Sequence, residues 1–599
     1  MHMGVDESYD LSIPHASPAP HHDVDAAHGS DDGNPAARHG HATTHATIRA
    51  NTTTGALRAL ETLAQLCVFD FLARLVTIRG SPLLIRDGPR FHHRGLLIDT
   101  ARHFLPVPVM ERVIDSMAYA KLNVLHWHMV DTQSFPIKTP SFPRLWLGAF
   151  SPSERYTTDD MRHIVHYAED RGVMVVPEID SPAHAASWGV GYPSLLPAAN
   201  CPEPLDVSKP FTFQLIKGVL QDLRAVFKSS HIHLGGDEVS FDCWNSSPAI
   251  SAWLQQRNLT AEGGYGYFVR RVQALAVEAG WQTAVIWEEP FKVFGADLDP
   301  ATTIVQNWFD TALPPAIVQS GFRMIFSNLN RGWYLDFVDR TWSEVYSQEP
   351  TAGIPEELQH LVVGGETCMW GERVDPSDLL NTVWPRAAAA AGESGMRLLL
   401  LRAHQPLSMH GLASLATLTR LHMFSCLLIS LIPSLCFPPP PLTERLWPPR
   451  AYVDLHLPQA HTRIHMFRCL LTSSLSTHPP PSLSVSLSPA SHSERLWSNQ
   501  AYVESHLSNA LDPTCACTCS AACSRRSIPP ISLCLYLPPP PGTERLWSPQ
   551  AYVDSHLSQA HTRLHIFRCL LTSRGIEAAP VDNAHARSQP PFPGSCYRQ

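Results

Sequence analysis

The sequence predicts an α/β protein built around a (β/α)8 TIM barrel over residues 91–391, and two observations carry this prediction. Eight short runs rich in apolar and β-branched residues alternate with amphipathic stretches, a pattern typical of parallel strands buried on both faces. The runs are GLLIDT (95–100), NVLHWHMV (123–130), GVMVVPEID (172–180), HIHLGGDEV (231–239), TAVIWEE (283–289), TTIVQNW (302–308), FRMIFSN (322–328) and LVVGGETCMWGE (361–372). They span roughly 300 residues, which is enough for eight strand–helix units.

Two segments precede the barrel. Residues 1–45 are rich in His, Ala, Asp and Gly and poor in large apolar side chains, so we expect a disordered segment, with a metal-binding His tract as the alternative. Residues 46–90 predict a small, partial α/β domain, because leucines recur near helical spacing between Gly55 and Leu75. The opening MHMGVDESYD lacks the basic and apolar regions of a signal peptide, which predicts a cytosolic protein or a missing true start.

The sequence repeats itself after the barrel. The copies are TERLWPPRAYVDLHL (443–457), SERLWSNQAYVESHL (493–507) and TERLWSPQAYVDSHL (543–557). A solenoid is disfavoured, because the Ser/Pro/Leu spacers would not stack into a continuous core. We predict a Pro/Ser-rich low-complexity insertion with ERLW repeats over residues 392–543 and a C-terminal completion of the barrel, ending in a helix, over residues 544–599. The apolar stretch 421–437 is short and interrupted by Pro433, so no membrane span is predicted.

Composition excludes several classes of function. With 17% charged residues and a formal net charge of -9, the chain has no basic surplus for binding nucleic acid. Its 14 cysteines include no paired CxxC motifs of the zinc-site type. Five cysteines crowd a Ser/Pro-rich tract, where a metal cluster is the alternative to an accident of composition: Cys515, Cys517, Cys519, Cys523 and Cys534. We predict neither a metal nor a cofactor.

Acids and tryptophans end or follow the predicted strands. In such a barrel the carboxyl ends of the strands and the loops after them carry the active site, so these side chains should converge in one pocket. They are Asp131, Glu178, Asp237, Glu238, Trp287, Trp308, Trp370 and Glu372.

Asp237 and Glu238 follow a pair of glycines in HLGGDEV. If the strand pleat continues, the two carboxylates point in different directions, which does not suit a standard glycosidase pair that flanks one bond. We therefore expect Glu238 to be a protonated general acid, its pKa raised by the neighbouring charge and partial burial, and Asp237 to stay ionised. A metal-ligating or helix-capping pair is the alternative.

The three strand-end tryptophans predict an aromatic slot that stacks on sugar C–H faces or encloses a small apolar group. For any one of them alone, core packing is the slightly better explanation. Their occurrence at one rim, with Tyr334, Asp336 and Glu372 in the same part of the pattern, favours a ligand with many hydroxyl groups.

Six motifs carry a resemblance to a known family. They are HRGLLIDTARHFLP (93–106), KLNVLHWHMVDTQSFP (121–136), VPEIDSPAH (176–184), HLGGDEV (233–239), RGWYLDF (331–337) and GGETCMWGE (364–372). In this order they resemble the β-N-acetylhexosaminidases of glycoside hydrolase family 20, which include the lysosomal hexosaminidase subunits. DESYDLSIP and GALRALETLAQL resemble pieces of that family's small N-terminal domain, which would be truncated here.

The resemblance implies a retaining, substrate-assisted reaction, an exception to the two-carboxylate scheme. The 2-acetamido oxygen of the substrate attacks the anomeric carbon and gives an oxazolinium intermediate. Glu238 would protonate the leaving oxygen and then activate water. Asp237 would accept a hydrogen bond from the acetamido N–H, and Tyr334 would hold the acetamido oxygen. Asp131 and His184 would orient the catalytic acid, although a structural role explains either one alone equally well.

The resemblance also implies how the terminal sugar binds. The residues are Arg102 at the 3- and 4-hydroxyls, Asp336 and Glu372 at the 4- and 6-hydroxyls, and Trp287, Trp308 and Trp370 around the acetyl methyl. Because apolar Phe337 follows Asp336, the site offers no cation for a sulfated sugar, so we expect neutral terminal N-acetylglucosamine or N-acetylgalactosamine on oligosaccharides or glycoconjugates. The alternative is a hexosaminidase-like barrel that binds sugar without turnover.

Family features bear on location and partners. Cys201 with Cys243, and Cys569 with Cys596, match pairs that are bridged in relatives. N-x-[ST] sequons begin at Asn51, Asn245 and Asn258. Together these features predict folding in a secretory compartment, and hence a lysosomal, vacuolar or secreted glycoprotein. Relatives commonly dimerise, which makes a homodimer an expectation.

The chain departs from the family pattern after Ala391. Joining Ala391 to Glu544 would give uninterrupted family sequence. Our hypothesis is that residues 392–543 represent retained intron sequence around tandemly repeated exons, or a mis-assembled gene. If the insertion is real, one ERLW copy completes the barrel.

Overall fold

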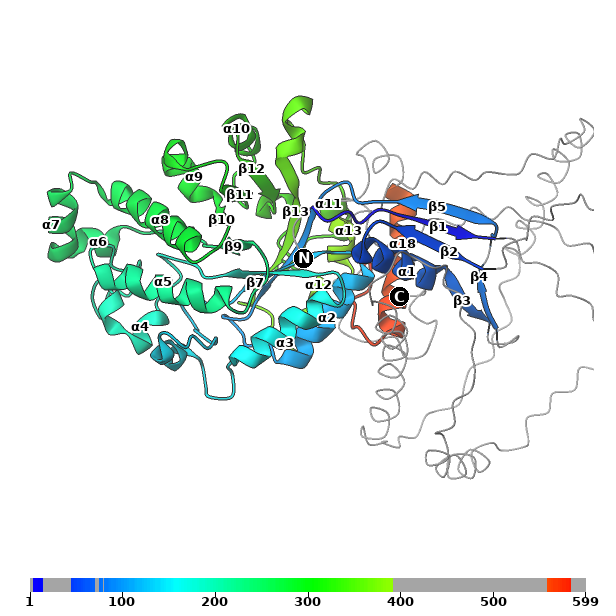
Figure 1. The fold of residues 1–599 in the computed structure, drawn as a ribbon, viewed down its shortest axis with the longest axis horizontal. Coiled ribbons are helices and arrows are strands. Elements are labelled where there is room, and N and C mark those ends of the chain that lie inside the picture. Colours follow the sequence, from blue (N-terminus) through cyan, green and yellow to red (C-terminus); the bar gives the residue numbers. More distant parts are fainter. Residues whose placement is uncertain (1–3, 15–44, 71–74, 79, 392–556, 583–599) are drawn as a thin grey trace, which may run out of the picture. The chain divides into compact units, whose positions relative to one another are not determined.

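In the computed structural model, the described residues are 4–14, 45–70, 75–78, 80–391 and 557–582 (Figure 1). Eight parallel strands close into a barrel in the order β10-β11-β12-β13-β6-β7-β8-β9. Their bounds are β6 (His93–Asp99), β7 (Val124–His128), β8 (Met174–Glu178), β9 (His231–His233), β10 (Thr283–Trp287), β11 (Thr303–Asn307), β12 (Arg323–Phe326) and β13 (Val362–Met369). The predicted (β/α)8 barrel is confirmed, and each predicted run overlaps one strand.

Helices connect the strands on the outside of the barrel (Figure 1). They are α2 (Val107–Tyr119), α3 (Thr158–Glu169), α4 (Trp188–Gly191), α5 (Pro210–Arg224), α6 (Asp242–Ser246), α7 (Pro248–Gln256), α8 (Ala261–Glu278), α9 (Glu288–Phe294), α10 (Pro314–Gln319), α11 (Trp342–Tyr346), α12 (Leu379–Val383) and α13 (Arg386–Ala391). Several predicted runs extend past the ends of their strands. Glu288 and Glu289 begin α9 directly after β10, β9 ends at His233, and β13 ends at Met369.

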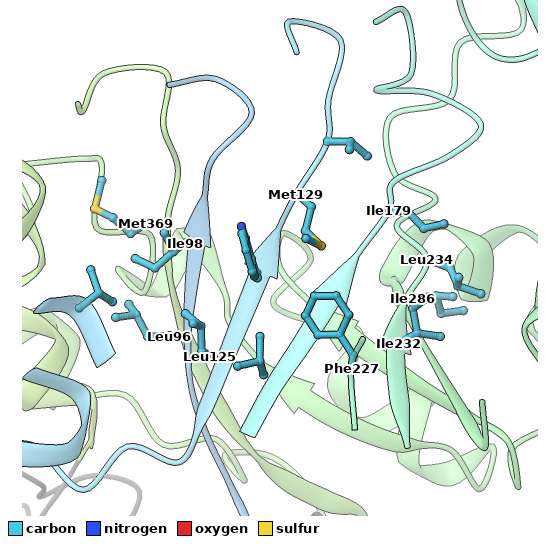
Figure 2. Close-up of a cluster of buried hydrophobic side chains, with 14 of the residues drawn as sticks. Leu96, Ile98, Leu125, Met129, Ile179, Phe227, Ile232, Leu234, Ile286 and Met369 are labelled. Carbon is cyan, nitrogen blue, oxygen red and sulfur yellow. The ribbon is translucent and has the colours of Figure 1, made fainter. Parts of the chain in front are cut away.

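Alternate residues of each strand face opposite sides of the barrel wall, as the pleat requires. In β6, Leu96 and Ile98 belong to the large core cluster that includes the buried face of α2, part of which Figure 2 shows. Leu97, between them, belongs to a separate cluster with Trp287 and Trp370. The side chains on the second face therefore fill the barrel interior and reach the site at its carboxyl end.

A small domain precedes the barrel. Strands β1 (Tyr9–Ile13), β2 (Thr47–Ala50) and β5 (Leu83–Asp87) form an antiparallel sheet, β3 (Cys67–Asp70) pairs with β4 (Leu75–Ile78), and the helix is α1 (Thr53–Leu66). The expected disorder of residues 1–45 is wrong for β1, the middle strand of this sheet. Tyr9, Leu11 and Ile13 alternate with polar residues and are buried, which is the period of a half-buried strand. Residues 15–44 lie outside the described part of the chain.

A buried ion cluster joins the small domain to the start of the first barrel strand. Glu7 accepts hydrogen bonds from Arg58 of α1 and from Arg94 of β6, each at 2.7 Å. Burial opposes ionisation of Glu7, but the two guanidinium groups lower its pKa to about 2. Next to this cluster, Lys121 donates hydrogen bonds to Asp87 and to the Tyr9 hydroxyl, each at 3.0 Å. Breaking a buried ion pair of this kind typically costs about 3–5 kcal/mol.

The last described helix, α18 (Leu557–Ser573), packs against the barrel. Leu564 and Phe567 lie in the large core cluster, and the Phe567 ring is 6.0 Å from that of Trp384. The segment after α18 continues this contact, since the Ala579 N–H donates to the Trp384 carbonyl at 3.0 Å. The predicted insertion over residues 392–543, with its cysteine tract, lies outside the described residues. No described helix is both long and apolar enough to cross a membrane.

The predicted disulfide between Cys201 and Cys243 is confirmed, and it ties the loop after β8 to α6. Cys569 is also disulfide-bonded. Its predicted pairing with Cys596 stays a prediction, because Cys596 lies outside the described residues.

Candidate active site

Every predicted site residue stands at or after the carboxyl end of a barrel strand. Arg102 follows β6, Asp131 follows β7, His184 follows β8, Asp237 and Glu238 follow β9, Trp287 ends β10, Trp308 follows β11, Tyr334 and Asp336 follow β12, and Trp370 and Glu372 follow β13. Side-chain contacts join most of these residues into two adjoining groups, an ionic group around His184 and an aromatic group around Trp370.

The glycine pair turns the chain sharply after β9. Gly235 and Gly236 have φ values of +65° and +102°, a region that favours glycine. A Cβ on Gly235 would overlap the carboxylate of Asp180, whose Oδ1 accepts the Gly236 N–H at 2.9 Å. Glu238 follows with a φ of +50°. The strand pleat therefore does not continue through this turn.

As a consequence, Asp237 and Glu238 face the same imidazole. The Nε2 atom of His184 lies 3.6 Å from Asp237 Oδ2 and 3.4 Å from Glu238 Oε2. The expectation that the carboxylates point apart is wrong, because the positive φ values turn both toward the loop after β8. Asp237 Oδ1 is buried and has no hydrogen-bond partner in the part of the chain that the structure describes.

The charge on His184 controls Glu238. Burial alone would lower the pKa of His184, but Asp237, Asp180 and hydrogen bonds to Asp131 and Glu238 raise it, so this imidazole is a cation. The hydrogen bond from His184 in turn lowers the pKa of Glu238, whose side chain is 59% exposed. The expected raised pKa of Glu238 is therefore wrong, because the adjacent cation outweighs partial burial.

Asp131 anchors the ionic group. It is fully buried and meets His128 Nε2 at 2.9 Å, His184 Nδ1 at 3.2 Å and an Arg102 amino group at 2.7 Å. Burial opposes its ionisation, but the hydrogen bonds from the two histidines lower its pKa. Arg102 also pairs with Asp99 at 3.0 Å, so its guanidinium is fixed by two buried carboxylates.

The aromatic group lies beside Arg102, whose guanidinium carbon is 5.0 Å from the centre of the Trp370 ring. Ring centres of Trp370 lie 5.9 Å from Trp287 and 6.0 Å from Tyr334, and Trp308 stacks on Tyr334 at 6.0 Å with an interplanar angle of 19°. Trp287 is almost wholly buried, and its indole N–H donates to a buried carboxylate of the barrel interior at 3.0 Å.

A pocket of about 340 Å³ opens at the ionic group. Four predicted residues line it, namely Arg102, Asp131, His184 and Glu238. The lining residues that sequence reasoning missed are Thr132, Gln133, Ala183, Glu203, Pro204 and Ser240. They all lie in the loops after β7, β8 and β9, and this position was the feature of the sequence that could have identified them. The tryptophans do not line this pocket.

Two further acids near Asp237 were missed as site residues. Burial, and then the charge of Asp237, raise the pKa of Glu289 to about 8, and its carboxylate accepts the Trp308 indole N–H at 3.0 Å. Asp180 is fully buried, and the same two causes raise its pKa. Their signal was position, because each comes within two residues of a strand end.

A buried network below the pocket was missed except for Glu178, which was expected to reach the pocket but does not line it. His126 lies 2.7 Å from Glu366 and 3.0 Å from Glu178, which also meets His128 at 2.6 Å and His233 at 2.8 Å. Burial lowers the pKa of His126, but the two carboxylates overcome this and raise it to about 9. The signal was histidine at alternate positions within apolar strands. His126, Glu178 and His233 are near enough to share a metal ion, but here they pair with one another.

Asp336 and Glu372 are the two remaining predicted acids. Glu372 is half-exposed and lies 3.7 Å from Arg102. Asp336 is buried, and burial followed by the charge of Glu372 raises its pKa to about 6. Its Oδ1 atom has no hydrogen-bond partner among the described residues, which leaves an acceptor for a hydroxyl group.

Comparisons with known proteins agree with this geometry. The family model described as glycosyl hydrolase family 20, catalytic domain, matches residues 91–394. Beta-hexosaminidase 1 of Arabidopsis thaliana is 52% identical over 384 residues, which are 64% of this chain and 69% of that protein. Beta-hexosaminidase subunit beta of Homo sapiens is 39% identical over 365 residues, 57% of this chain and 63% of that protein.

A solved structure gives the same picture for the fold. The chitobiase of Flavobacterium johnsoniae matches with a TM-score of 0.55 and 30% identity, over 64% of this chain and 55% of the chitobiase. The chain thus spans between 55% and 69% of the length of these three proteins.

Proposed function

Since the chain belongs to glycosyl hydrolase family 20, we propose that it is a β-N-acetylhexosaminidase acting on terminal N-acetylglucosamine and N-acetylgalactosamine. The observation that carries this proposal is the shared contact of Asp237 and Glu238 with the His184 cation, beside a cluster of three tryptophans and a tyrosine. Two carboxylates held by one imidazole suit a reaction in which only one of them exchanges a proton with the substrate.

The proposed reaction is substrate-assisted, in keeping with the family. The carbonyl oxygen of the 2-acetamido group forms a bond to the anomeric carbon as the bond to the leaving oxygen breaks, and Glu238 gives its proton to that oxygen. The product is an oxazolinium ion. The Glu238 carboxylate then takes a proton from water, which attacks the anomeric carbon and restores the acetamido group with retained configuration.

Asp237 supports the acetamido group in this scheme. Its Oδ1 atom, buried and without a partner in the described residues, is suited to accept the acetamido N–H. The acceptor then faces positive charge that develops on the nitrogen during attack. Tyr334, from the same aromatic cluster, is the proposed donor to the acetamido oxygen. Trp287, Trp308 and Trp370 would enclose the acetyl methyl.

The ionic group positions the acid and the sugar. Arg102, fixed by Asp99 and Asp131, would bind the 3- and 4-hydroxyls, while Asp336 and Glu372 would bind the 4- and 6-hydroxyls. Because His184 lowers the pKa of Glu238, the protonated acid is more abundant at acidic pH. We therefore propose an acidic pH optimum, consistent with a lysosomal or vacuolar enzyme.

Location and assembly are further proposals. The Cys201–Cys243 disulfide fits folding in an oxidising compartment. All three predicted sequon asparagines, Asn51, Asn245 and Asn258, are exposed, as glycan attachment requires. A homodimer stays a prediction.

The test is hydrolysis of aryl and alkyl β-N-acetylglucosaminides by the full chain and by Glu238→Gln. General acid–base catalysis contributes about 10²- to 10⁴-fold, so we expect a loss of this order, larger for alkyl leaving groups, which need the proton more. Glu111→Gln, a similar change at a half-buried carboxylate of α2, should keep full activity. Binding of the sugar without turnover by the full chain would instead support a sugar-binding protein.

A further inference from the structure

Two histidines lie one turn apart on α18, far along the sequence from the active-site motifs. His561 and His565 have ring centres 4.6 Å apart, and Asp582, beyond the helix, turns back toward both. Its Oδ1 atom is 2.8 Å from His561 Nε2 and its Oδ2 atom is 3.4 Å from His565 Nε2. We propose that these three side chains form a binding site for a divalent transition-metal ion, with Zn²⁺ the best match.

The donor set and its spacing favour this ion. Two imidazoles and one carboxylate suit Zn²⁺, whereas Mg²⁺ and Ca²⁺ prefer oxygen ligands. Metal bonds of about 2.0–2.1 Å in tetrahedral geometry separate the ligand atoms by about 3.3 Å. The separation of His565 and Asp582 already has this value, at 3.4 Å, and all the donor atoms lie within 4.8 Å of one another. The shorter contact of His561 is a hydrogen bond that must lengthen by about 0.5 Å.

The backbone holds both halves of the site. Histidines at positions i and i+4 share one helix face, the spacing that recurs in zinc sites. The opposite face of α18 is fixed in the core through Phe567. On the other side of the site, Val581 is buried directly before Asp582. Asp582 itself is 62% exposed, which lets an ion enter and leaves room for a water ligand.

Among the ERLW repeats, only the last one carries both histidines and the aspartate. An earlier ERLW repeat carries the same histidine pair, His461 and His465, but Ser482 takes the place equivalent to Asp582. In this last copy the metal would therefore link α18, through its two histidines, to the segment after it, through Asp582. This role is independent of the glycosidase reaction.

The test measures Zn²⁺ bound by the full chain after removal of metals with a chelator and dialysis against Zn²⁺. Because the histidine-rich residues 1–45 also offer ligands, the variants are compared with the parent chain. We expect His565→Gln and Asp582→Asn each to bind one Zn²⁺ fewer per chain, or to bind it at least tenfold more weakly. His163→Gln, at an exposed histidine of α3 that pairs with Glu111 at 2.6 Å, should match the parent.

A second readout separates metal binding from damage to the fold. Zn²⁺ should raise the melting temperature of the parent and of His163→Gln, but not that of Asp582→Asn, whose side chain is exposed and whose loss leaves the core intact. Hydrolysis of the aryl substrate without metal should be equal in all three. Equal Zn²⁺ stoichiometry and equal thermal response in all variants would overturn the site, and show that the cluster is held by hydrogen bonds alone.

Discussion

The buried network below the pocket makes folding stability depend on pH in a specific way. Burial opposes a charge on His126, yet Glu366 and Glu178 raise its pKa to about 9, against about 6.5 in an unfolded chain. The group therefore binds a proton more tightly when folded. Its contribution is fully present below pH 6.5 and is lost as the pH rises from there to 9. The two pKa values correspond to about 3 kcal/mol, or about 1.4 kcal/mol per pH unit across this window.

Glu366→Gln removes the carboxylate that lies 2.7 Å from His126. We expect this variant to be less stable than the parent at pH 6 by about 3–5 kcal/mol, the cost of breaking a buried pair. The difference should shrink toward pH 9, because the parent loses a larger contribution of His126 than the variant, in which only Glu178 is left to raise the pKa of that histidine. Urea unfolding at intervals from pH 6 to 9 measures both curves. A constant difference across this range would refute the assignment of a protonated His126.

Two further predictions concern the acid and the last helix. In His184→Gln, loss of the cation raises the pKa of Glu238, so the alkaline limb of the kcat/KM profile should move to higher pH while the maximum falls; an unmoved limb would contradict this coupling. Phe567→Ala removes a fully buried ring of α18 and should lower the free energy of unfolding by about 3–5 kcal/mol in urea titrations, whereas a loss below about 1 kcal/mol would exclude α18 from the folded core.

The barrel could be predicted from sequence because its strands are buried on both faces. Runs such as VLHWH and MVVPE alternate with helices, and no other common fold needs eight of them. The exact residue at which each strand ends was harder to predict. The sequence predicts Glu289 at the end of a strand, but α9 begins one residue earlier, at Glu288. The Glu288 carboxylate accepts hydrogen bonds from the backbone N–H groups of residues 308–310, which directly follow β11.

The electrostatics of the site could not be predicted, because they depend on residues distant in sequence. The motif HLGGDEV places Glu238 beside Asp237, which suggests a raised pKa. In the fold, His184 arrives from the loop after β8 and reverses that direction. The resemblance of DESYDLSIP placed β1 in the N-terminal domain, but the residue pattern alone missed this strand, for another reason. Five residues with period-two burial are too few to stand out within a segment that is otherwise low in complexity.

The central claim is that the acetamido group of the substrate is the nucleophile. The most direct measurement is kcat for aryl glucosaminides whose N-acetyl group carries zero, one, two or three fluorine atoms. Fluorine withdraws electron density from the carbonyl oxygen, so we predict that kcat falls with each added fluorine. We also predict that the kcat of Asp237→Asn is lower than that of the parent for every one of these substrates. Rates independent of fluorination would contradict the account, because the nucleophile would then belong to the protein or to water.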